Sequence, residues 1–431
     1  MLLPLEIRLL SFVRLKNKLL MKILIVHMRY HPDKTGTAPL ITQLAQDLVK
    51  SGSDVTVIAS LPHYGRTTIH PDYRVYDGFF HQSEEMGVKI LRTPVFLPCK
   101  NSIYSRALNY LSYNILSVIA GLKISRVDVI LSVNPPITTT FSAWLLSIFH
   151  RAPLVVGIQD VWPDCIIQVN KLSNNVLIIF SKILEKVQYR IAKKIIVLSP
   201  GMRANLERKG VKARKIEIIA NWADTENVKP LPKKNDFSLA HKLEDYFVVL
   251  FAGNHGYIAA LENVIAAANL LKKFPEILFL LAGEGSVKND LIQQAEEKDL
   301  DNIRFLSTQP EQEWLEMLAA ADLTLVSLRS DLAGLNVPSK VYTLMAAGRP
   351  ILASVPEESE VAELVINAKS GIICKPDDPD DMAEKILDVW QNNELLDKLG
   401  GNGRKFMLEK FNRQMQTARY LSILRSAQTG N

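Results

Sequence analysis

Short apolar runs alternate along the chain with longer segments of helical periodicity. The runs are rich in Val, Ile and Leu and have few polar interruptions, which is typical of strands buried on both faces of a parallel sheet. Strands alternating with helices indicate βαβ units. In the first half of the chain, strands are expected at 22–26, 54–59, 88–92, 129–133, 154–158, 194–198 and 215–219.

A second alternating set follows a polar, proline-containing stretch at 221–235, which reads as a linker. Its strands are expected at 246–252, 277–282, 302–306, 323–328, 351–355 and 371–374, and helices at 379–392 and about 395–426 close the chain. The pattern predicts an α/β protein with two doubly wound, Rossmann-like domains that face an interdomain cleft. The expected division is an extension at 1–20, a first domain at 21–220, the linker, and a second domain at 236–411, with a helix at about 412–426 packing back on the first domain.

One helix has its boundaries marked in the sequence. Ser339 is a good N-cap, 341–347 is compatible with a helix, Gly348 suits a left-handed C-terminal position, and Pro350 prevents continuation. The helix start is expected at the carboxyl edge of a parallel sheet, where free N–H groups and Lys340 would form an anion site. The anion most often held in this way is a phosphate.

Two glycine-containing loops follow strands of the same set. Gly253-Asn254-His255-Gly256 follows the first strand, and Gly283-Glu284-Gly285 follows the next. Glycine allows a backbone to approach a ligand closely, although each loop alone could equally be a tight turn. Together with the helix at Lys340, they place three candidate elements at one edge of a sheet.

The first half has no dinucleotide fingerprint after its first strand. Its loop at 27–37 is long and polar, as a substrate-facing loop would be, and its histidines are not assigned to a metal. Asn134-Pro135-Pro136 follows another strand and shapes the same edge. Asp160 follows the strand at 154–158, where it could orient a sugar hydroxyl or assist proton transfer, or instead cap a helix.

Charge is distributed unevenly along the chain. Residues 1–220 carry 29 basic against 14 acidic side chains, a balance of +15, whereas the whole chain is at +6. The first half is therefore expected to meet something anionic, such as a phosphorylated substrate or an anionic membrane surface. Basic amphipathic segments at 105–126 and 173–194 could lie on anionic lipid, or simply have solvated basic faces.

Other features bound the class of protein. No apolar run is long enough to cross a bilayer, and residues 1–20 could be a surface amphipathic helix or a dispensable extension before Met21. Cys99, Cys165 and Cys374 are widely spaced, which favours a reducing compartment. No metal-ligand cluster and no nucleic-acid-binding motif is evident.

These segments together resemble a family of sugar transferases. The chain is similar over about 21–425 to family-four retaining glycosyltransferases of the GT-B fold, in the branch that includes colanic-acid and O-antigen fucosaminyl-type transferases. The resemblance is carried by Tyr30-His31-Pro32-Asp33 to Gly36, Gln159-Asp160-Val161-Trp162-Pro163, Leu198-Ser199-Pro200-Gly201-Met202, Ala220-Asn221-Trp222-Ala223-Asp224, Gly253-Asn254-His255-Gly256, and Pro338-Ser339-Lys340 with Met345 to Pro350.

The resemblance implies that the second half binds a nucleotide-diphosphate sugar and the first half an acceptor, with no metal and no other cofactor. It implies catalytic roles for Asp160 and Lys340. It implies donor binding by Gly253, Asn254, Gly256, Glu284, Ser339, Lys340 and Thr343, and acceptor-side roles for Thr35, Gly36 and Asn134. The chain departs from the family at Thr343 and Leu335, where glutamates are common, and at Tyr257, where a basic residue is common.

The expected function is sugar transfer, with retention, to a lipid-linked or polysaccharide acceptor in cell-surface polysaccharide biosynthesis. The expected location is the cytoplasm, on the inner face of the plasma membrane. Two alternatives stay open at this point. A nucleotide-sugar epimerase would convert the donor with no acceptor, and a non-catalytic nucleotide-sugar-binding protein would fit the departures at Thr343 and Leu335.

Overall fold

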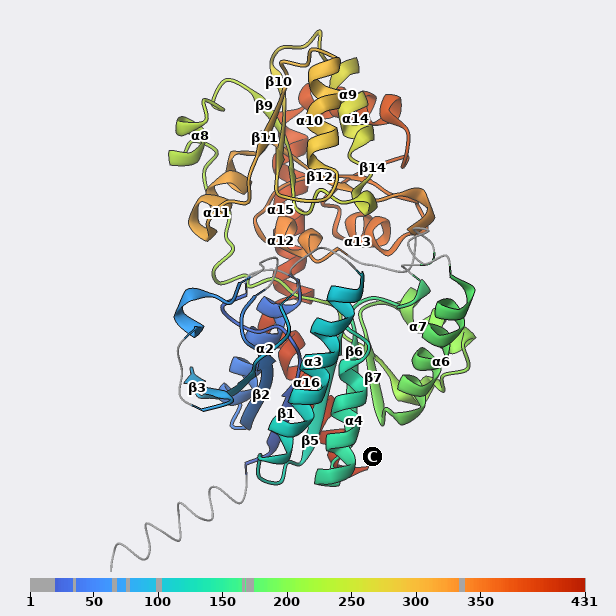
Figure 1. Cartoon of the computed structure of the whole chain (residues 1–431). Coiled ribbons are helices and arrows are strands. Elements are labelled where there is room, and N and C mark those ends of the chain that lie inside the picture. The colour runs from blue at the N-terminus through green and yellow to red at the C-terminus, as the bar shows by residue number, and fades with distance from the viewer. Residues whose placement is uncertain are drawn as a thin grey trace, which may run out of the picture. The chain divides into compact units, whose positions relative to one another are not determined.

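The computed structural model describes residues 20–33, 36–63, 68–74, 78–97, 103–164, 167, 174–332 and 338–430. The chain forms two compact units (Figure 1). Unit 1 comprises Met1–Trp162, Ile179–Ile219 and Thr417–Asn431, and unit 2 comprises Pro163–Ile178 and Ala220–Gln416. Each unit is a Rossmann-like α/β sandwich with a largely or wholly parallel sheet.

The sheet of unit 1 has the strand order β3-β4-β2-β1-β5-β6-β7-β8. All neighbouring pairs are parallel except β3 with β4, which is antiparallel at one edge. The central strands β1, β5 and β6 are almost completely buried, as their continuous apolar sequences require. The strands are β1 Lys22–Val26, β2 Asp54–Ser60, β3 His81–Glu85, β4 Val88–Thr93, β5 Val129–Asn134, β6 Leu154–Ile158, β7 Lys194–Val197 and β8 Ile216–Ile218.

Helices cover both faces of this sheet. From β1 the chain moves towards the β3 edge of the sheet to reach β2, whereas from β4 it moves towards the β8 edge to reach β5 and then β6. Because such connections are right-handed, α2 lies on one face of the sheet and α3 and α4 lie on the other. Figure 1 shows α3 and α4 side by side. The helices of unit 1 are α2 Ala38–Lys50, α3 Ile103–Leu122, α4 Thr139–His150, α7 Pro200–Arg208, and most of α6 Asn175–Ile191 and α16 Arg413–Thr429.

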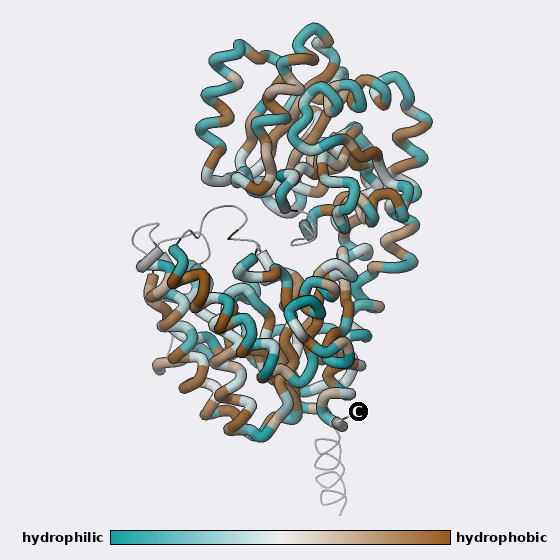
Figure 2. Tube along the Cα trace, turned by 90° about the vertical axis from the view of Figure 1, so that its right-hand side faces the viewer, coloured by the Kyte–Doolittle hydropathy of each residue, from teal (hydrophilic) through white to brown (hydrophobic). Residues whose placement is uncertain are grey.

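The sheet of unit 2 is wholly parallel, in the order β11-β10-β9-β12-β13-β14. Its strands are β9 Phe247–Ala252, β10 Ile277–Ala282, β11 Ile303–Leu306, β12 Leu323–Ser327, β13 Ile351–Ser354 and β14 Gly371–Cys374. Its helices are α8 Asp236–Ala240, α9 Glu262–Leu270, α10 Lys288–Glu297, α11 Glu311–Ala320, α12 Lys340–Ala346, α13 Glu360–Ala368, α14 Pro379–Trp390 and α15 Asn393–Lys410. Figure 2 shows hydrophobic stretches running through the interior of both units.

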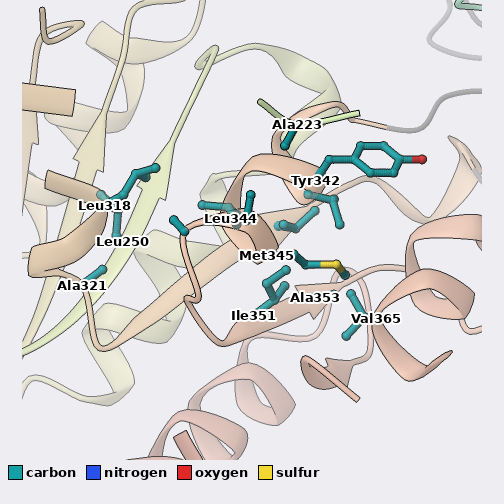
Figure 3. Close-up of a cluster of buried hydrophobic side chains, with 14 of the residues drawn as sticks. Ala223, Leu250, Leu318, Ala321, Tyr342, Leu344, Met345, Ile351, Ala353 and Val365 are labelled. Atoms are coloured by element: carbon teal, nitrogen blue, oxygen red, sulfur yellow. The ribbon is translucent and has the colours of Figure 1, made fainter. Parts of the chain in front are cut away.

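A large core cluster surrounds α12 in unit 2. Leu344 and Met345 of this helix pack with Ile351 and Ala353 of the next strand, and Val365 of α13 joins the same cluster (Figure 3). Five of the seven helical residues are buried. Burial on most sides fixes the position of this short helix, because its own backbone bonds would not keep seven residues helical in water.

The strand predictions are confirmed within one residue at either end. The edge strand β3 was missed because its sequence, His-Gln-Ser-Glu-Glu, contains no apolar run. The predicted closing helix is in fact two helices, α15 and α16. The break falls at Asn412, whose side-chain oxygen accepts a hydrogen bond from the Met415 amide at 2.8 Å and so caps the second helix.

The C-terminal end of α12 agrees with the prediction from the sequence, whereas the N-terminal end does not. Gly348 has a φ of +67°, and its amide and that of Arg349 bond to the carbonyls of Met345 and Leu344 at 3.0 and 3.1 Å, as expected for a glycine-terminated helix. Ser339, in contrast, is not a side-chain N-cap. Its backbone is helical and its hydroxyl makes no capping bond, so the prediction of a capping role was wrong.

The segment predicted as a linker is held against unit 2 by several side chains. The Arg404 guanidinium donates to the carbonyls of Thr225, Val228 and Ala346 at 2.6–2.8 Å. Lys233 pairs with Asp322 at 2.6 Å. These contacts hold much of the segment 221–235 against unit 2. None of the helices described is long and apolar enough to cross a membrane.

Candidate active site

The carboxyl edge of the unit 2 sheet brings two glycine loops into backbone contact. The Gly253 amide donates to Ala282, and the His255 amide donates to the Glu284 carbonyl, both at 2.9 Å. A Cβ at Gly283 would lie 1.9 Å from the Gly253 carbonyl oxygen, and one at Gly285 would lie 2.1 Å from that of His255. These two positions therefore require glycine, and the loops form one tightly packed backbone surface.

Lys340, at the start of α12, extends to this surface. Its Nζ lies 3.6 Å from the centre of the Phe251 ring, and a Cβ on Gly253 would be 3.8 Å from it. Burial lowers the pKa of Lys340 to about 7. Among the described residues no carboxylate pairs with this ammonium group. A partly desolvated cation that lies against an aromatic face and pairs with no described carboxylate is a favourable site for an anionic ligand.

His255, between the loop glycines, is completely buried. Neither of its ring nitrogens has a hydrogen-bond partner within bonding distance in the described part of the chain. Burial, and to a smaller extent the charge on Lys288, lowers the pKa of His255 to about 4. The ring is therefore neutral at physiological pH and rests against Phe251, 5.8 Å between ring centres. No role for His255 was predicted from the sequence, although its position between two glycines after a strand was a usable signal.

Lys288 is a second residue that the sequence did not single out. Its ammonium group donates to the carbonyls of Gly283 and Leu306, at 2.9 and 3.1 Å, and to the Glu284 carboxylate at 2.9 Å. It thus ties the ends of two neighbouring strands together. The hydrogen bond from Lys288 also lowers the pKa of the Glu284 carboxyl. The spacing of four residues between a glutamate and a lysine was the only signal in the sequence.

The other residues expected to bind the donor lie on the same elements. Asn254 is exposed in the first glycine loop, and Gly256 is half-buried at its end. Ser339 is exposed beside the start of α12, and Thr343 is half-buried one turn after Lys340. The structure thus gathers the donor-side candidates at one edge of unit 2, whereas Leu335 lies outside the described residues.

In unit 1, Asn134 and Asp160 lie at the carboxyl ends of the adjacent strands β5 and β6. Asn134 ends β5 beside Ile158 of β6, and the Gln159 amide donates to the Asn134 carbonyl at 3.3 Å. Asp160 comes directly after this contact and is half-buried. Burial raises the pKa of the Asp160 carboxyl to about 6. A carboxyl group that ionises near neutral pH can accept or hold a proton during a reaction.

The Asn134 side chain is engaged within unit 1. Its amide nitrogen donates to Gln188 at 2.8 Å, and Gln188 also accepts from the Thr140 hydroxyl at 3.1 Å. The Asn134 side-chain oxygen is buried and has no partner within bonding distance in the described part of the chain. The Asn134–Gln188 hydrogen bond therefore joins β5 to α6, and Gln188 extends the connection to α4.

His27 fixes the loop that follows β1. It is fully buried, and its Nδ1 donates to the Val133 carbonyl at 2.8 Å, so its Nε2 accepts from the Thr37 hydroxyl at 2.8 Å. Burial lowers the pKa of His27 to about 4, so the ring stays neutral. Gly36, with a φ of +64°, completes the turn into α2. From the sequence, His27 was placed in a polar loop and not assigned to a metal, and its two hydrogen bonds were not predicted. Thr35 lies outside the described residues.

No group of three or more His, Cys, Asp or Glu side chains comes close enough to hold a metal ion within the ranges that the structure describes.

Comparison with known proteins assigns both halves of the chain to sugar transferases. Residues 35–227 match the family described as "Glycosyltransferase Family 4", and residues 233–406 match "Glycosyl transferases group 1". The chain is 28% identical over 334 residues to a probable glycosyltransferase, WbjE, of Pseudomonas aeruginosa, covering 76% of this chain and 82% of the relative. It is 24% identical to a putative colanic acid biosynthesis glycosyl transferase, WcaI, of Escherichia coli K12, covering 82% and 88%.

Solved structures share the fold. HepE of Anabaena, crystallised with UDP, superposes with a TM-score of 0.70 at 17% identity, covering 94% of this chain and all of that one. A sucrose-phosphate synthase of Thermosynechococcus elongatus gives 0.72 at 17% identity, covering 95% and 100%. With two family matches that together run from residue 35 to residue 406, the chain is a GT-B glycosyltransferase of the group 1 / family 4 type.

Proposed function

We propose that this protein transfers a sugar from a nucleotide-diphosphate sugar to a lipid-linked or polysaccharide acceptor, with retention of the anomeric configuration, in cell-surface polysaccharide biosynthesis. The relative from E. coli, whose name assigns it to colanic acid biosynthesis, supports this setting. The structures of HepE with UDP and with UDP-glucose support a nucleotide sugar as the donor.

The observation that carries the proposal is the ammonium group of Lys340. It lies 3.6 Å from the Phe251 ring centre, near the Gly253 backbone, and pairs with no described carboxylate. A diphosphate placed there would receive the charge of Lys340 in a poorly solvated site. Negative charge grows on the diphosphate as the sugar departs, so this interaction strengthens in the transition state.

The remaining donor contacts follow from the same edge of unit 2. The loops at Gly253 and Gly283 offer backbone close to the bound phosphates. Thr343 lies one turn after Lys340 and can make one neutral hydrogen bond to the ribose. Such a bond is weaker than one from a carboxylate, so we expect the ribose hydroxyl groups to contribute only modestly to donor affinity.

On the acceptor side, Asp160 and the loop ending at Gly36 would position the attacking hydroxyl group. With a pKa of about 6, Asp160 is mostly ionised at neutral pH and can accept a hydrogen bond from that hydroxyl. It would act as an orienting group.

Retention would follow from attack on the face that the diphosphate leaves. The bond between the anomeric carbon and the phosphate oxygen breaks, and the acceptor oxygen bonds to the same carbon on the same face. The acceptor's proton passes to the departing phosphate oxygen. This route needs no protein nucleophile, and Lys340 stabilises the charge on the leaving group.

Replacing Lys340 with alanine tests the proposal. Loss of one charge-stabilising group is expected to lower the transfer rate by a factor of about 100 or more. Lys272→Ala, at a partly exposed lysine of the same unit whose nearest carboxylate is 3.5 Å away, is the matched control and should transfer normally. Nucleotide release and the anomeric configuration of the product, read by NMR, are the measurements.

Near-normal turnover by the Lys340→Ala protein would show that Lys340 does not stabilise the leaving diphosphate. A product with inverted configuration would overturn retention. Conversion of the donor sugar in the absence of any acceptor would instead support an epimerase.

A further inference from the structure

Two neighbouring helices of unit 1 present large apolar side chains to the outside. On α3 these are Leu108, Leu111, Ile115, Ile119 and Leu122, and on α4 they are Leu145, Ile148 and Phe149. Each is between 43% and 58% exposed. The spacing of three and four residues along α3 places all five on one face of the helix. We call these eight residues the apolar stripe.

The stripe is a continuous surface because α3 and α4 pack closely. The Ser142 hydroxyl of α4 donates to the Asn114 carbonyl of α3 at 3.0 Å. Further along, a Cβ on Gly121 would lie 2.5 Å from the Leu146 side chain, and His150 bonds to the Gly121 carbonyl at 3.1 Å. The two helices therefore run parallel, and Figure 1 shows them side by side. An apolar patch of this extent on a folded unit marks an interaction site.

The charge around the stripe has one sign. Between residues 94 and 159 the sequence has a single acidic side chain, Asp128, whose carboxylate accepts a hydrogen bond from the Lys22 amide at 2.8 Å. Four exposed basic residues flank the helices: Arg106 on the first turns of α3, and Lys123, Arg126 and Arg151 just after the helix ends. Apolar side chains rimmed by cations fit the interface of an anionic bilayer.

The same charges disfavour a second copy of the chain as the occupant. A symmetric dimer through this face would bring Lys123, Arg126 and Arg151 of both copies into one interface. Like charges at an interface oppose association unless acidic groups compensate, and neither α3 nor α4 contains an Asp or Glu. Trp144 and Tyr110, half-buried on the same helices, are residue types enriched at the membrane–water boundary.

We propose that the apolar stripe of α3 and α4 is the membrane-docking surface of this protein and inserts into the interface of an anionic lipid bilayer. An anionic bilayer would then be a partner of unit 1, the unit that carries the acceptor-side residues. Only the biological use of this docking rests on the proposed function. Helices on a sheet face run along the strands, so docking by this face would lay the strands of unit 1 parallel to the membrane plane. The carboxyl edge with Asp160 would then open sideways, along the lipid surface.

Vesicle flotation with the full chain tests the proposal. We expect the wild-type protein to float with vesicles containing about 30% phosphatidylglycerol and to bind much less to pure phosphatidylcholine. The triple variant Leu111→Gln, Ile115→Gln, Ile119→Gln should lose about tenfold or more in partitioning, because the inserted apolar area is removed. The variant Lys123→Gln, Arg126→Gln, Arg151→Gln should lose the preference for anionic lipid.

The matched control is Leu270→Gln, Ile366→Gln, Leu408→Gln, three exposed apolar residues of unit 2, which should bind vesicles like the wild type. A protein that begins at Met21 should also bind normally. Transfer to a water-soluble saccharide by the stripe variant should stay normal, which separates docking from catalysis and shows that the variant is folded.

Equal binding by the stripe variant and the wild type would overturn the proposal. So would loss of binding in the protein that begins at Met21, which would assign docking to residues 1–20. A stripe variant that turns a dimer into a monomer by light scattering, with vesicle binding unchanged, would assign the stripe to a second copy.

Discussion

Lys340 combines a positive charge with a site that solvates it poorly. Its ammonium group faces the Phe251 ring, and its pKa is lowered from 10.5 to about 7 by burial. A diphosphate at this position would raise that pKa again, because an opposite charge favours the charged form. Donor binding should therefore be coupled to proton uptake at neutral pH.

The first prediction concerns the pH dependence of donor affinity. Above about pH 7 the empty site loses its charge, so the affinity for the nucleotide sugar should fall by up to about tenfold per pH unit. Calorimetry in two buffers with different ionisation enthalpies would measure both the affinity and the proton uptake. Lys340→Met should bind weakly and without this pH dependence. Equal affinity on both sides of neutrality in the wild type would contradict the coupling.

A second prediction concerns Asp160, whose pKa is raised to about 6 by burial. If the carboxylate orients the acceptor, transfer should rise as pH increases through about 6 and then level off, since the protonated form cannot accept the hydrogen bond in the same way. Asp160→Asn should lower the plateau and remove this limb of the profile. A limb near pH 6 that persists in the variant would assign it to another group. Turnover at saturating donor over a pH series is the measurement.

At the scale of elements, α12 is held in place by close contact with α15. A Cβ on Gly400 would lie 2.2 Å from the Gly348 carbonyl oxygen, whereas a Cβ on Gly401 meets nothing within 4 Å. Gly400→Ala should destabilise the protein by about 1–3 kcal/mol because the helices must separate. Gly401→Ala, at the next position of the same helix, should be neutral or stabilise by about 0.5–1 kcal/mol. Denaturant unfolding of both variants measures the contrast, and equal effects would refute the close packing.

Strands and most helices could be predicted because the residues that determine them lie within the same short segment of sequence. A buried parallel strand needs a continuous apolar run, and α12 ends where Gly348 permits a positive φ. The roles of His255 and Lys288 could not be predicted in this way. His255 is set by the ring of Phe251 and by burial, and Lys288 by carbonyls of two other segments. Ser339 does not cap α12 with its side chain, because its backbone is helical whereas a capping residue has an extended backbone.

At the scale of the whole molecule, binding of the donor should raise the free energy of unfolding. A nucleotide sugar that binds only the folded protein at about 100 times its dissociation constant adds about 2.7 kcal/mol to the free energy of unfolding. A thermal-shift panel of nucleotide sugars should therefore single out the true donor. The same donor should shift Lys340→Ala much less, with Lys272→Ala as the control. A panel in which no nucleotide sugar shifts the wild type would contradict donor binding.

The last helix has a consequence for how the protein is made. Residues from Thr417 onward belong to unit 1, where the Thr417 hydroxyl bonds to Asp47 at 3.1 Å and Leu424 is fully buried. Most of unit 2, Ala220–Gln416, is therefore translated after the first two segments of unit 1 and before its third. On the ribosome, unit 2 can finish folding while unit 1 still lacks its final helix. A nascent chain arrested just before Thr417 would carry one finished unit and one with uncovered apolar surface. The interval before α16 is made is therefore the stage most exposed to aggregation and to chaperone capture.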